Sequence, residues 1–198
     1  MNTVIIQYNA GNIQSVLYAL ERLGATATVT DNIDTILAAD KVIFPGVGEA
    51  STAMHYLKQR GLDEVIKNLK QPVFGICLGM QLMCNYSEEN NTNCLGIFDE
   101  QVKLFSPNDP SLKVPQIGWN TISNLKTTLF NGVHENSFTY FVHGYYATIG
   151  DHTIATTNYV QPYSSALQKN NFYGVQFHPE KSATVGAQII QNFLDITC

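Results

Sequence analysis

The sequence is poor in positive charge. Its 198 residues include 11 lysines and arginines against 16 aspartates and glutamates, and Arg22 and Arg60 are the only arginines. Proteins that bind nucleic acid cluster basic side chains to neutralise several phosphates, and this sequence contains no such cluster. We therefore expect no nucleic-acid partner.

Long hydrophobic runs are also missing. No segment approaches the roughly 20 apolar residues that cross a membrane, and residues 1–6 lack the basic start of an export signal. The hydrophobic fraction is nevertheless 44%, which is enough for one sizeable core. We therefore expect a single domain over residues 1–198 that stays in the cytoplasm and has no contact with a membrane.

Cysteine is scarce as well. The four cysteines lie at positions 77, 84, 94 and 198, none of them forms a Cys-x-x-Cys pair, and no histidine stands at a zinc-ligand spacing from any of them. This pattern argues against a disulfide scaffold and against a structural zinc site. We expect no metal and no other cofactor.

The first half alternates apolar runs with helical patterns. The apolar or β-branched runs are 4–6, 26–30, 42–44 and 72–76, and the helical patterns are 13–23, 49–59 and 62–69. A turn is expected at 9–12, before the first helix. Apolar strands that alternate with helices are typical of a parallel sheet covered by helices.

The second half is rich in short strand-like runs. These runs are 138–142, 145–149, 153–157, 165–168 and 173–177, and a last helix is expected at 183–194 with Ser182 as its N-cap. Residues 106–113 are expected to form an exposed loop. The sequence therefore predicts an α/β fold with a central, mostly parallel sheet flanked by helices and an added antiparallel portion in the C-terminal half.

The strongest chemical signal is the segment Gly75-Ile76-Cys77-Leu78-Gly79, which joins a buried strand to the helical pattern 80–85. This spacing is typical of a nucleophile elbow, because glycine on each side leaves room for a sharp turn that exposes the sulfur. The N-terminus of the helix then favours the thiolate. The alternative is a buried core cysteine, which is our interpretation of Cys84.

A cysteine nucleophile needs a base and a carboxylate that orients it. His178-Pro179-Glu180 offers both at the end of an apolar strand. Taken singly, His178 would be a strand-end histidine and Glu180 a surface charge, but together with Cys77 they predict a catalytic triad. The other histidines are weaker candidates: His55, His134, His143 and His152.

Acyl transfer also requires donors for an oxyanion. The backbone N–H of Leu78 is one candidate, and Pro45-Gly46-Val47-Gly48 is the natural source of a second, at Val47 or Gly48. A glycine pair after a strand would look the same in a phosphate loop or a tight turn, although the lysine of a phosphate loop is absent.

Three motifs together resemble the class I glutamine amidotransferases. They are Gly75-Ile-Cys77-Leu-Gly79-Met-Gln81, Pro45-Gly-Val-Gly48 and Phe177-His178-Pro179-Glu180. The resemblance extends from end to end of the chain. It implies that glutamine is hydrolysed to glutamate and ammonia through a thioester at Cys77.

A narrower resemblance is to one branch of that family, the amidotransferase subunits of imidazole glycerol phosphate synthases. It rests on Gly11-Asn12, Gly118-Trp119-Asn120, Tyr140-Phe-Val-His143 and Gln176-Phe-His-Pro-Glu-Lys-Ser182. It implies a heterodimer with a cyclase subunit of (βα)8 barrel fold, which receives ammonia through a tunnel. The products would be imidazole glycerol phosphate and aminoimidazole carboxamide ribotide, in histidine biosynthesis.

The resemblance also implies residue roles. The glutamine contacts would be Gly48, Gln81, Glu89 and the backbone at Gly144 and Tyr145. The contacts with the partner would be Asn12, Gln116, Trp119 and Lys181. Two positions depart from the pattern, since Gln116 stands where many relatives carry histidine and Gly144 where serine or threonine is common.

Three alternatives remain open. A paralogous subunit would supply ammonia to a different synthase, for example one that aminates a sugar. A non-catalytic subunit would retain the sheet as a binding platform, and a stand-alone cysteine hydrolase would be active without a partner. The triad residues argue against the second alternative but do not identify the ammonia acceptor.

Overall fold

The central sheet of the computed structural model carries its parallel strands side by side. The structure describes residues 1–8 and 12–197, so that most of the turn expected at 9–12 and Cys198 lie outside it. The parallel strands lie in the order β2 (Ala27–Thr30), β1 (Thr3–Ile6), β3 (Lys41–Gly46), β4 (Val73–Cys77) and β13 (Phe172–Val175). The alternating pattern of the first half therefore folds as predicted, and β13 from the C-terminal half joins it.

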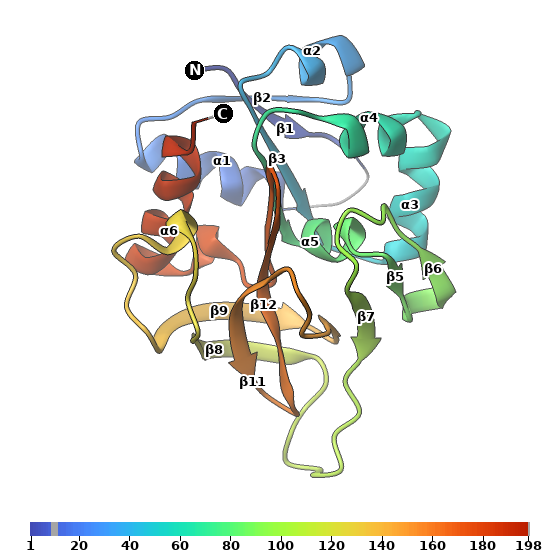
Figure 1. Cartoon of the computed structure of the whole chain (residues 1–198), viewed down its shortest axis with the longest axis vertical. Helices are drawn as coiled ribbons and strands as arrows, with labels where there is room; N and C mark the ends of the chain where they lie inside the picture. Colours follow the sequence, from blue (N-terminus) through green and yellow to red (C-terminus); the bar gives the residue numbers. More distant parts are fainter. Residues whose placement is uncertain (9–11, 198) are drawn as a thin grey trace.

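Helices cover both faces of this sheet. Figure 1 shows α1 (Ile13–Arg22) and α6 (Ala183–Asp195) on one side, and α3 (Ala50–Gln59) and α4 (Leu62–Asn68) on the other. Each pair packs on its own buried hydrophobic cluster, which fits the two-sided burial of parallel strands. A short helix, α2 (Ile33–Leu37), joins β2 to β3. Within the described residues, no helix combines the length and apolar character needed to cross a bilayer.

The antiparallel portion extends the sheet beyond β13. Its strands follow the order β12 (Pro162–Lys169), β10 (Tyr145–Ala147), β7 (Gln101–Leu104), β5 (Tyr86–Ser87) and β6 (Thr92–Asn93), and β11 (Thr153–Asn158) also pairs with β12. All of these contacts are antiparallel except the one between β7 and β5. The predicted fold class is thus confirmed in both of its parts.

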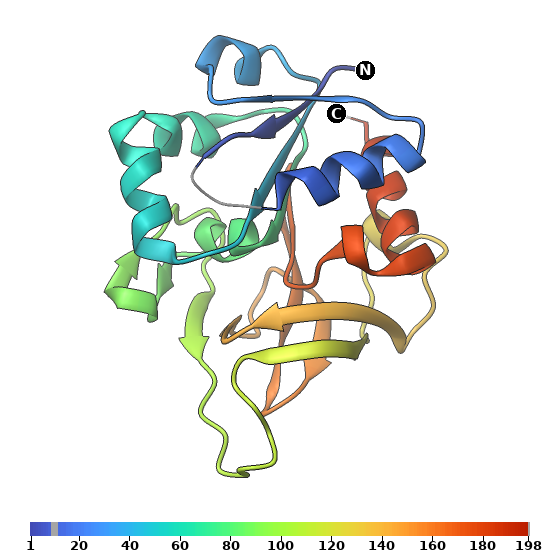
Figure 2. The ribbon, with the colours of Figure 1, turned by 180° about the vertical axis from the view of Figure 1, so that it is seen from behind.

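A separate two-stranded sheet lies below α1 and α6 in Figure 2. It consists of β8 (Gln116–Ile122) and β9 (Ser137–His143), which pair antiparallel with Gln116 opposite His143. The sequence did not indicate β8, because this strand contains a glycine and an asparagine and exposes large apolar side chains such as Ile117 and Trp119. It did indicate most of β9.

The described part of the chain also contains three short 3₁₀ turns, at Glu89–Asn91, Thr128–Phe130 and Pro179–Lys181. The last of them carries Glu180 and leads directly into α6. The loop expected at 106–113 is present and largely exposed. Ser182 occupies the N-cap position of α6, as predicted. The prediction that its side chain caps the helix was wrong, because that side chain makes no hydrogen bond to the first turn of α6.

Candidate active site

Cys77 stands at the junction of two elements. It is the last residue of β4, and α5 (Leu78–Met83) begins at the next residue. Its backbone angles are φ 54° and ψ −110°, a conformation that residues with a side chain rarely adopt. Such strain at a strand-to-helix turn is the geometry of a nucleophile elbow, as the sequence predicted.

The two flanking glycines permit the close approach that this turn requires. A Cβ atom on Gly79 would lie 1.8 Å from the carbonyl oxygen of Phe44 in β3. A Cβ atom on Gly75 would lie 2.3 Å from Cε of Met83 and 2.9 Å from the backbone nitrogen of Met80. Only glycine lets α5 pack this tightly on β3 and β4, so the spacing in the sequence has a direct steric cause.

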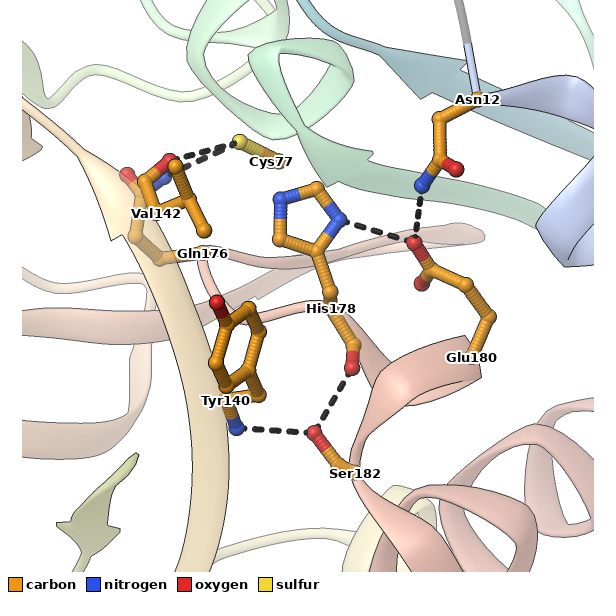
Figure 3. Close-up of polar contacts among 8 residues, drawn as sticks. All are labelled: Asn12, Cys77, Tyr140, Val142, Gln176, His178, Glu180 and Ser182. Carbon is orange, nitrogen blue, oxygen red and sulfur yellow. Dashed lines mark hydrogen bonds and ion pairs between the residues drawn. The ribbon is translucent and has the colours of Figure 1, made fainter. Parts of the chain in front are cut away.

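His178 and Glu180 lie next to Cys77, although 101 positions separate Cys77 from His178 in the sequence. Figure 3 shows the imidazole ring between the two, with one nitrogen toward the sulfur and the other toward the carboxylate. Nδ1 of His178 is 2.8 Å from Oε1 of Glu180. Both side chains are almost entirely buried. The three side chains therefore lie in the order expected of a nucleophile, a base and an orienting carboxylate.

The electrostatics of His178 fit this order. Burial alone lowers the pKa of His178, but the interactions with Cys77 and then with Glu180 outweigh it and raise the pKa to about 10. A charged imidazole next to the sulfur can stabilise a thiolate and can donate a proton to a leaving group.

Two further residues hold the base and the carboxylate in place. The side-chain amide of Asn12 donates a hydrogen bond to Oε1 of Glu180, the same oxygen that contacts His178. The hydroxyl of Ser182 donates to the carbonyl of His178 at 2.7 Å and accepts from the N–H of Tyr140 in β9 at 2.9 Å. The N–H of His178 in turn donates to the carbonyl of Tyr140 at 2.8 Å. The segment that carries His178 is thus fastened to β9 (Figure 3).

A cavity of about 320 Å³ opens in front of Cys77. This size suits a small amino acid. Residues from distant parts of the chain line it: Val47, Gly48, Cys77, Leu78, Gln81, Glu89, Pro115, Val142, His143, Gly144, Tyr145, His178 and Lys181. The structure therefore brings together, around one cavity, the residues expected to act as nucleophile and base, those expected to donate to an oxyanion and those expected to contact glutamine.

Gln81 is connected to the sulfur of Cys77 by hydrogen bonds through the side-chain amide of Gln176. Its Nε2 donates to the carbonyl of Tyr145 at 3.0 Å and to Oε1 of Gln176 at 2.8 Å. Nε2 of Gln176 then donates to Sγ of Cys77 at 3.7 Å. Gln176 is completely buried. Gln176 is the first residue of the motif that ends at Ser182, but only the structure shows that its side chain reaches the sulfur.

Glu89 supplies a negative charge to the cavity. One of its oxygens accepts the N–H of Ala50 at 2.8 Å. Burial raises the pKa of Glu89, the hydrogen bond from Ala50 opposes this, and the nearby Glu49 raises it further. The side chain suits recognition of an ammonium group, because a cation offsets the cost of its partial burial.

The remaining predicted residues occupy different environments. Gly48 has a φ of 114°, a backbone conformation that favours glycine, and Val47 is partly exposed at the cavity rim. Trp119 is 52% exposed on β8, whereas Gln116 on the same strand is only 4% exposed. Within the described residues, no group of three or more histidine, cysteine, aspartate or glutamate side chains is arranged to hold a metal ion.

His143 is a weaker catalytic candidate by sequence, because no acidic residue stands near it in the sequence. The structure buries it in the cavity wall, with its Nδ1 2.6 Å from the carbonyl of Tyr145. Burial lowers the pKa of His143 to about 4, although the hydrogen bond to Tyr145 opposes this shift. The strand motif ending at His143 marked the segment, but no local signal marked the contact.

Comparison with protein families gives one match that covers nearly the whole chain. Residues 4–196 match the model of the class I glutamine amidotransferases. A Bacteroides fragilis protein named imidazole glycerol phosphate synthase subunit HisH is 58% identical over 196 residues, covering 99% of this chain and 100% of the relative. A Vibrio cholerae protein of the same name is 46% identical over 202 residues and covers 98% of both chains.

Solved structures resemble the chain in fold. A glutamine amidotransferase structure superposes with a TM-score of 0.74 at 16% identity, covering 97% of each chain. A glutamine amidotransferase from Thermotoga maritima superposes with a TM-score of 0.62 at 16% identity, covering 98% of this chain and 82% of the other. At this identity the likeness concerns the fold alone.

Proposed function

Since the chain belongs to the class I glutamine amidotransferases, we propose that it is the glutaminase subunit of an imidazole glycerol phosphate synthase. The observation that carries this proposal is the cavity in which Cys77 and His178 meet Gln81 and Glu89. The relatives with this subunit name, one of them 58% identical over 99% of the chain, support the choice of pathway.

The reaction begins at the sulfur of Cys77. The thiolate attacks the side-chain amide carbon of glutamine, and the carbonyl electrons move to the oxygen to give a tetrahedral oxyanion. The N–H groups of Leu78 and of Val47 or Gly48 stabilise that oxyanion. His178 donates its proton to the amide nitrogen, the C–N bond breaks, and ammonia leaves a thioester at Cys77.

Hydrolysis of the thioester regenerates the enzyme. His178, now neutral, takes a proton from water, and the hydroxide attacks the thioester carbon. The C–S bond then breaks, glutamate leaves, and the thiolate faces a protonated His178 again. Glu180 orients the ring throughout by accepting from Nδ1.

Glutamine carries both of its charged groups on the α-carbon, and the cavity residues recognise that end of the substrate. The carboxylate of Glu89 is the only acidic side chain among the residues that line the cavity, so we assign it to the α-ammonium group. Gln81, Gly48 and the backbone of Gly144 and Tyr145 form the remainder of the pocket. The residues of this site use no cofactor in this scheme.

The ammonia acceptor lies on a second subunit. We propose a heterodimer with the cyclase subunit, a (βα)8 barrel, in which ammonia passes directly between the two sites in the cytoplasm. The large exposed apolar side chains of β8 and β9, namely Ile117, Trp119 and Phe138, supply a surface for such a partner. Lys181 lines both the cavity and the neighbouring groove that contains Trp119. The resemblance to the synthase subunits adds Asn12 and Gln116 to the interface assignment.

The decisive experiment replaces Cys77 with serine. In complex with the cyclase, Cys77→Ser should release no glutamate from glutamine, while synthesis of imidazole glycerol phosphate from added ammonium continues at the wild-type rate. Glutamate release by the variant at more than a small fraction of the wild-type rate would overturn the assignment of Cys77. A wild-type protein that releases glutamate but supports no synthesis with the cyclase would point to another acceptor, such as a sugar.

A further inference from the structure

A chain of buried polar side chains connects β8 to the glutamine pocket. The carbonyl of Tyr145 accepts from Nδ1 of His143 at 2.6 Å, and Nε2 of His143 lies 3.2 Å from the hydroxyl of Tyr163 in β12. That hydroxyl lies 3.1 Å from the side-chain amide of Gln116, the first residue of β8. Gln116, Tyr163 and His143 are all at most 6% exposed. Buried polar contacts of this kind are costly unless each group has a partner.

The donor and the acceptor of each hydrogen bond in this chain of polar side chains can be assigned. A backbone carbonyl can only accept a hydrogen bond. Nδ1 of His143 must therefore be protonated and donate to the carbonyl of Tyr145. Burial and the nearby His178 keep His143 neutral, which leaves its Nε2 as an acceptor. The hydroxyl of Tyr163 must therefore donate to His143. The structure places Oε1 of Gln116 at 3.1 Å from this hydroxyl. Because the single hydroxyl proton goes to His143, we assign the Gln116 amide in the opposite orientation, with Nε2 donating to Tyr163. Thr157 is a further hydrogen-bond neighbour of that hydroxyl.

The far end of the chain fixes a wall of the cavity. The Tyr145 carbonyl accepts from Gln81 as well as from His143, so both of its lone pairs are used. The Gly144 carbonyl accepts the N–H of Phe105 at 3.0 Å. With both carbonyls occupied inside the protein, this segment has only its N–H groups left for a substrate, and these suit the α-carboxylate of glutamine.

We propose that Tyr163 and His143 are positioning residues for the glutamine pocket: Tyr163 fixes the tautomer of His143, which holds the Tyr145 carbonyl and with it Gln81. Gln116 anchors the chain on β8, the strand that turns Trp119 outward. The proposal rests on the proposed glutaminase function, and it assigns to Gln116 an inward contact in addition to its place near the partner surface.

Tyr163→Phe tests the chain with the smallest change, because it removes only the hydroxyl. In the complex with the cyclase, we expect the KM for glutamine to rise about three- to tenfold, the effect of one lost buried hydrogen bond, while kcat stays within about twofold. Synthesis from added ammonium should be unchanged. Tyr173→Phe is the matched control, because Tyr173 is a buried tyrosine in β13 that takes no part in this hydrogen-bond chain. The KM of the Tyr173→Phe variant for glutamine should equal that of the wild type.

Three further variants separate positioning from a general loss of structure. His143→Asn keeps a donor near the Nδ1 position and should raise KM less than His143→Leu, which removes it. Gln116→Met, alone and combined with Tyr163→Phe, should show non-additive effects, because either change breaks the same chain. If the effects of Gln116→Met and Tyr163→Phe on KM were fully additive, the proposed hydrogen-bond connection between the two residues would be overturned.

An unchanged KM in Tyr163→Phe, or a loss confined to kcat, would also overturn this inference. Neither outcome would touch the proposed function, which fails only if the wild-type complex releases no glutamate. All of the variants should melt within a few degrees of the wild type, and Tyr163→Phe alone suffices if a His143 variant does not fold.

Discussion

Asn12 and His178 share one oxygen atom of Glu180. The amide of Asn12, at the start of α1, donates to Oε1, and Nδ1 of His178 lies 2.8 Å from the same atom. The other oxygen of Glu180 is buried and has no hydrogen-bond partner among the described residues. The position of the carboxylate, and therefore of the imidazole ring, depends on a residue 168 positions away in the sequence.

Removal of the Asn12 side chain should therefore slow the reaction. We choose Asn12→Gly because the backbone at this position has a φ of 73°, which glycine adopts without strain. Loss of one hydrogen bond to a charged group should lower kcat about tenfold, with little change in the KM for glutamine. Steady-state glutamate release in the complex measures both kcat and KM. Gly61, the N-cap residue of α4, has a similar φ of 66°, so the fold already carries glycine at a backbone position of this kind. A kcat equal to the wild type would mean that Asn12 does not orient Glu180.

Glu180→Gln should change both the rate and its dependence on pH. The negative charge of Glu180 contributes to raising the pKa of His178 to about 10, so its removal lowers that pKa. In the proposed mechanism His178 must carry a proton to release ammonia, so the activity at high pH should decline at a lower pH in the variant than in the wild type. We expect kcat to fall by about 10³-fold, less than in Cys77→Ser. The profile of kcat/KM from pH 6 to 11 measures the shift, and an alkaline limb at the wild-type position would contradict it.

Ser182→Ala should loosen the segment that carries His178. The change leaves the N–H of Tyr140 and the carbonyl of His178 each without the hydroxyl that now contacts it. We expect a loss of about 1 to 3 kcal/mol in unfolding free energy and a lower kcat. Ser137→Ala is the control, because the hydroxyl of Ser137 donates to the carbonyl of His134 at an exposed site. Urea unfolding of both variants should separate them, and equal losses would show that Ser182 has no special role.

Gly79→Ala should destabilise the fold strongly. Its Cβ would stand 1.8 Å from the Phe44 carbonyl oxygen, and the backbone of β3 can yield only by moving a core strand. We expect a loss of about 3 kcal/mol or more, which corresponds to a fall of roughly 6 to 12 °C in Tm. Gly144→Ala is the matched control, because its Cβ would meet nothing nearer than Val114 Cγ1 at 3.6 Å. Similar melting temperatures for the two variants would refute the steric account of the elbow.

The isolated chain should be a poor glutaminase that the cyclase activates. The Gly46–Val47 peptide ends β3 beside the cavity, and Gly48 follows with a φ of 114°. Rotation of this peptide would turn the N–H of Val47 toward or away from the oxyanion, a contribution of about 3 to 4 kcal/mol, or 10²- to 10³-fold in rate. Initial glutamate release should rise from the isolated chain to the complex, and again when the cyclase holds its nucleotide. Three equal rates would exclude this switch.

Local sequence determined the nucleophile elbow and the fold class. The role of Gly75 and Gly79 can be predicted from their spacing around Cys77 alone. A strand-to-helix turn that lies this close to β3 and β4 leaves no room for a side chain at either position. The alternation of apolar runs with helical patterns likewise indicated a mostly parallel sheet flanked by helices. His178 and Glu180 followed from the chemistry that a cysteine nucleophile needs.

Only the tertiary structure decided which side chains hold that chemistry in place. Asn12 reaches Glu180, and Gln116 reaches His143 through Tyr163, across elements far apart in the sequence. The sequence also could not show that Gln116 points inward while Trp119, three residues later, points outward, since β8 was not recognised as a strand. Hydrophobic spacing reports which face of an element is buried, but contacts between polar side chains depend on strand register and on how separate elements pack, which no local pattern encodes.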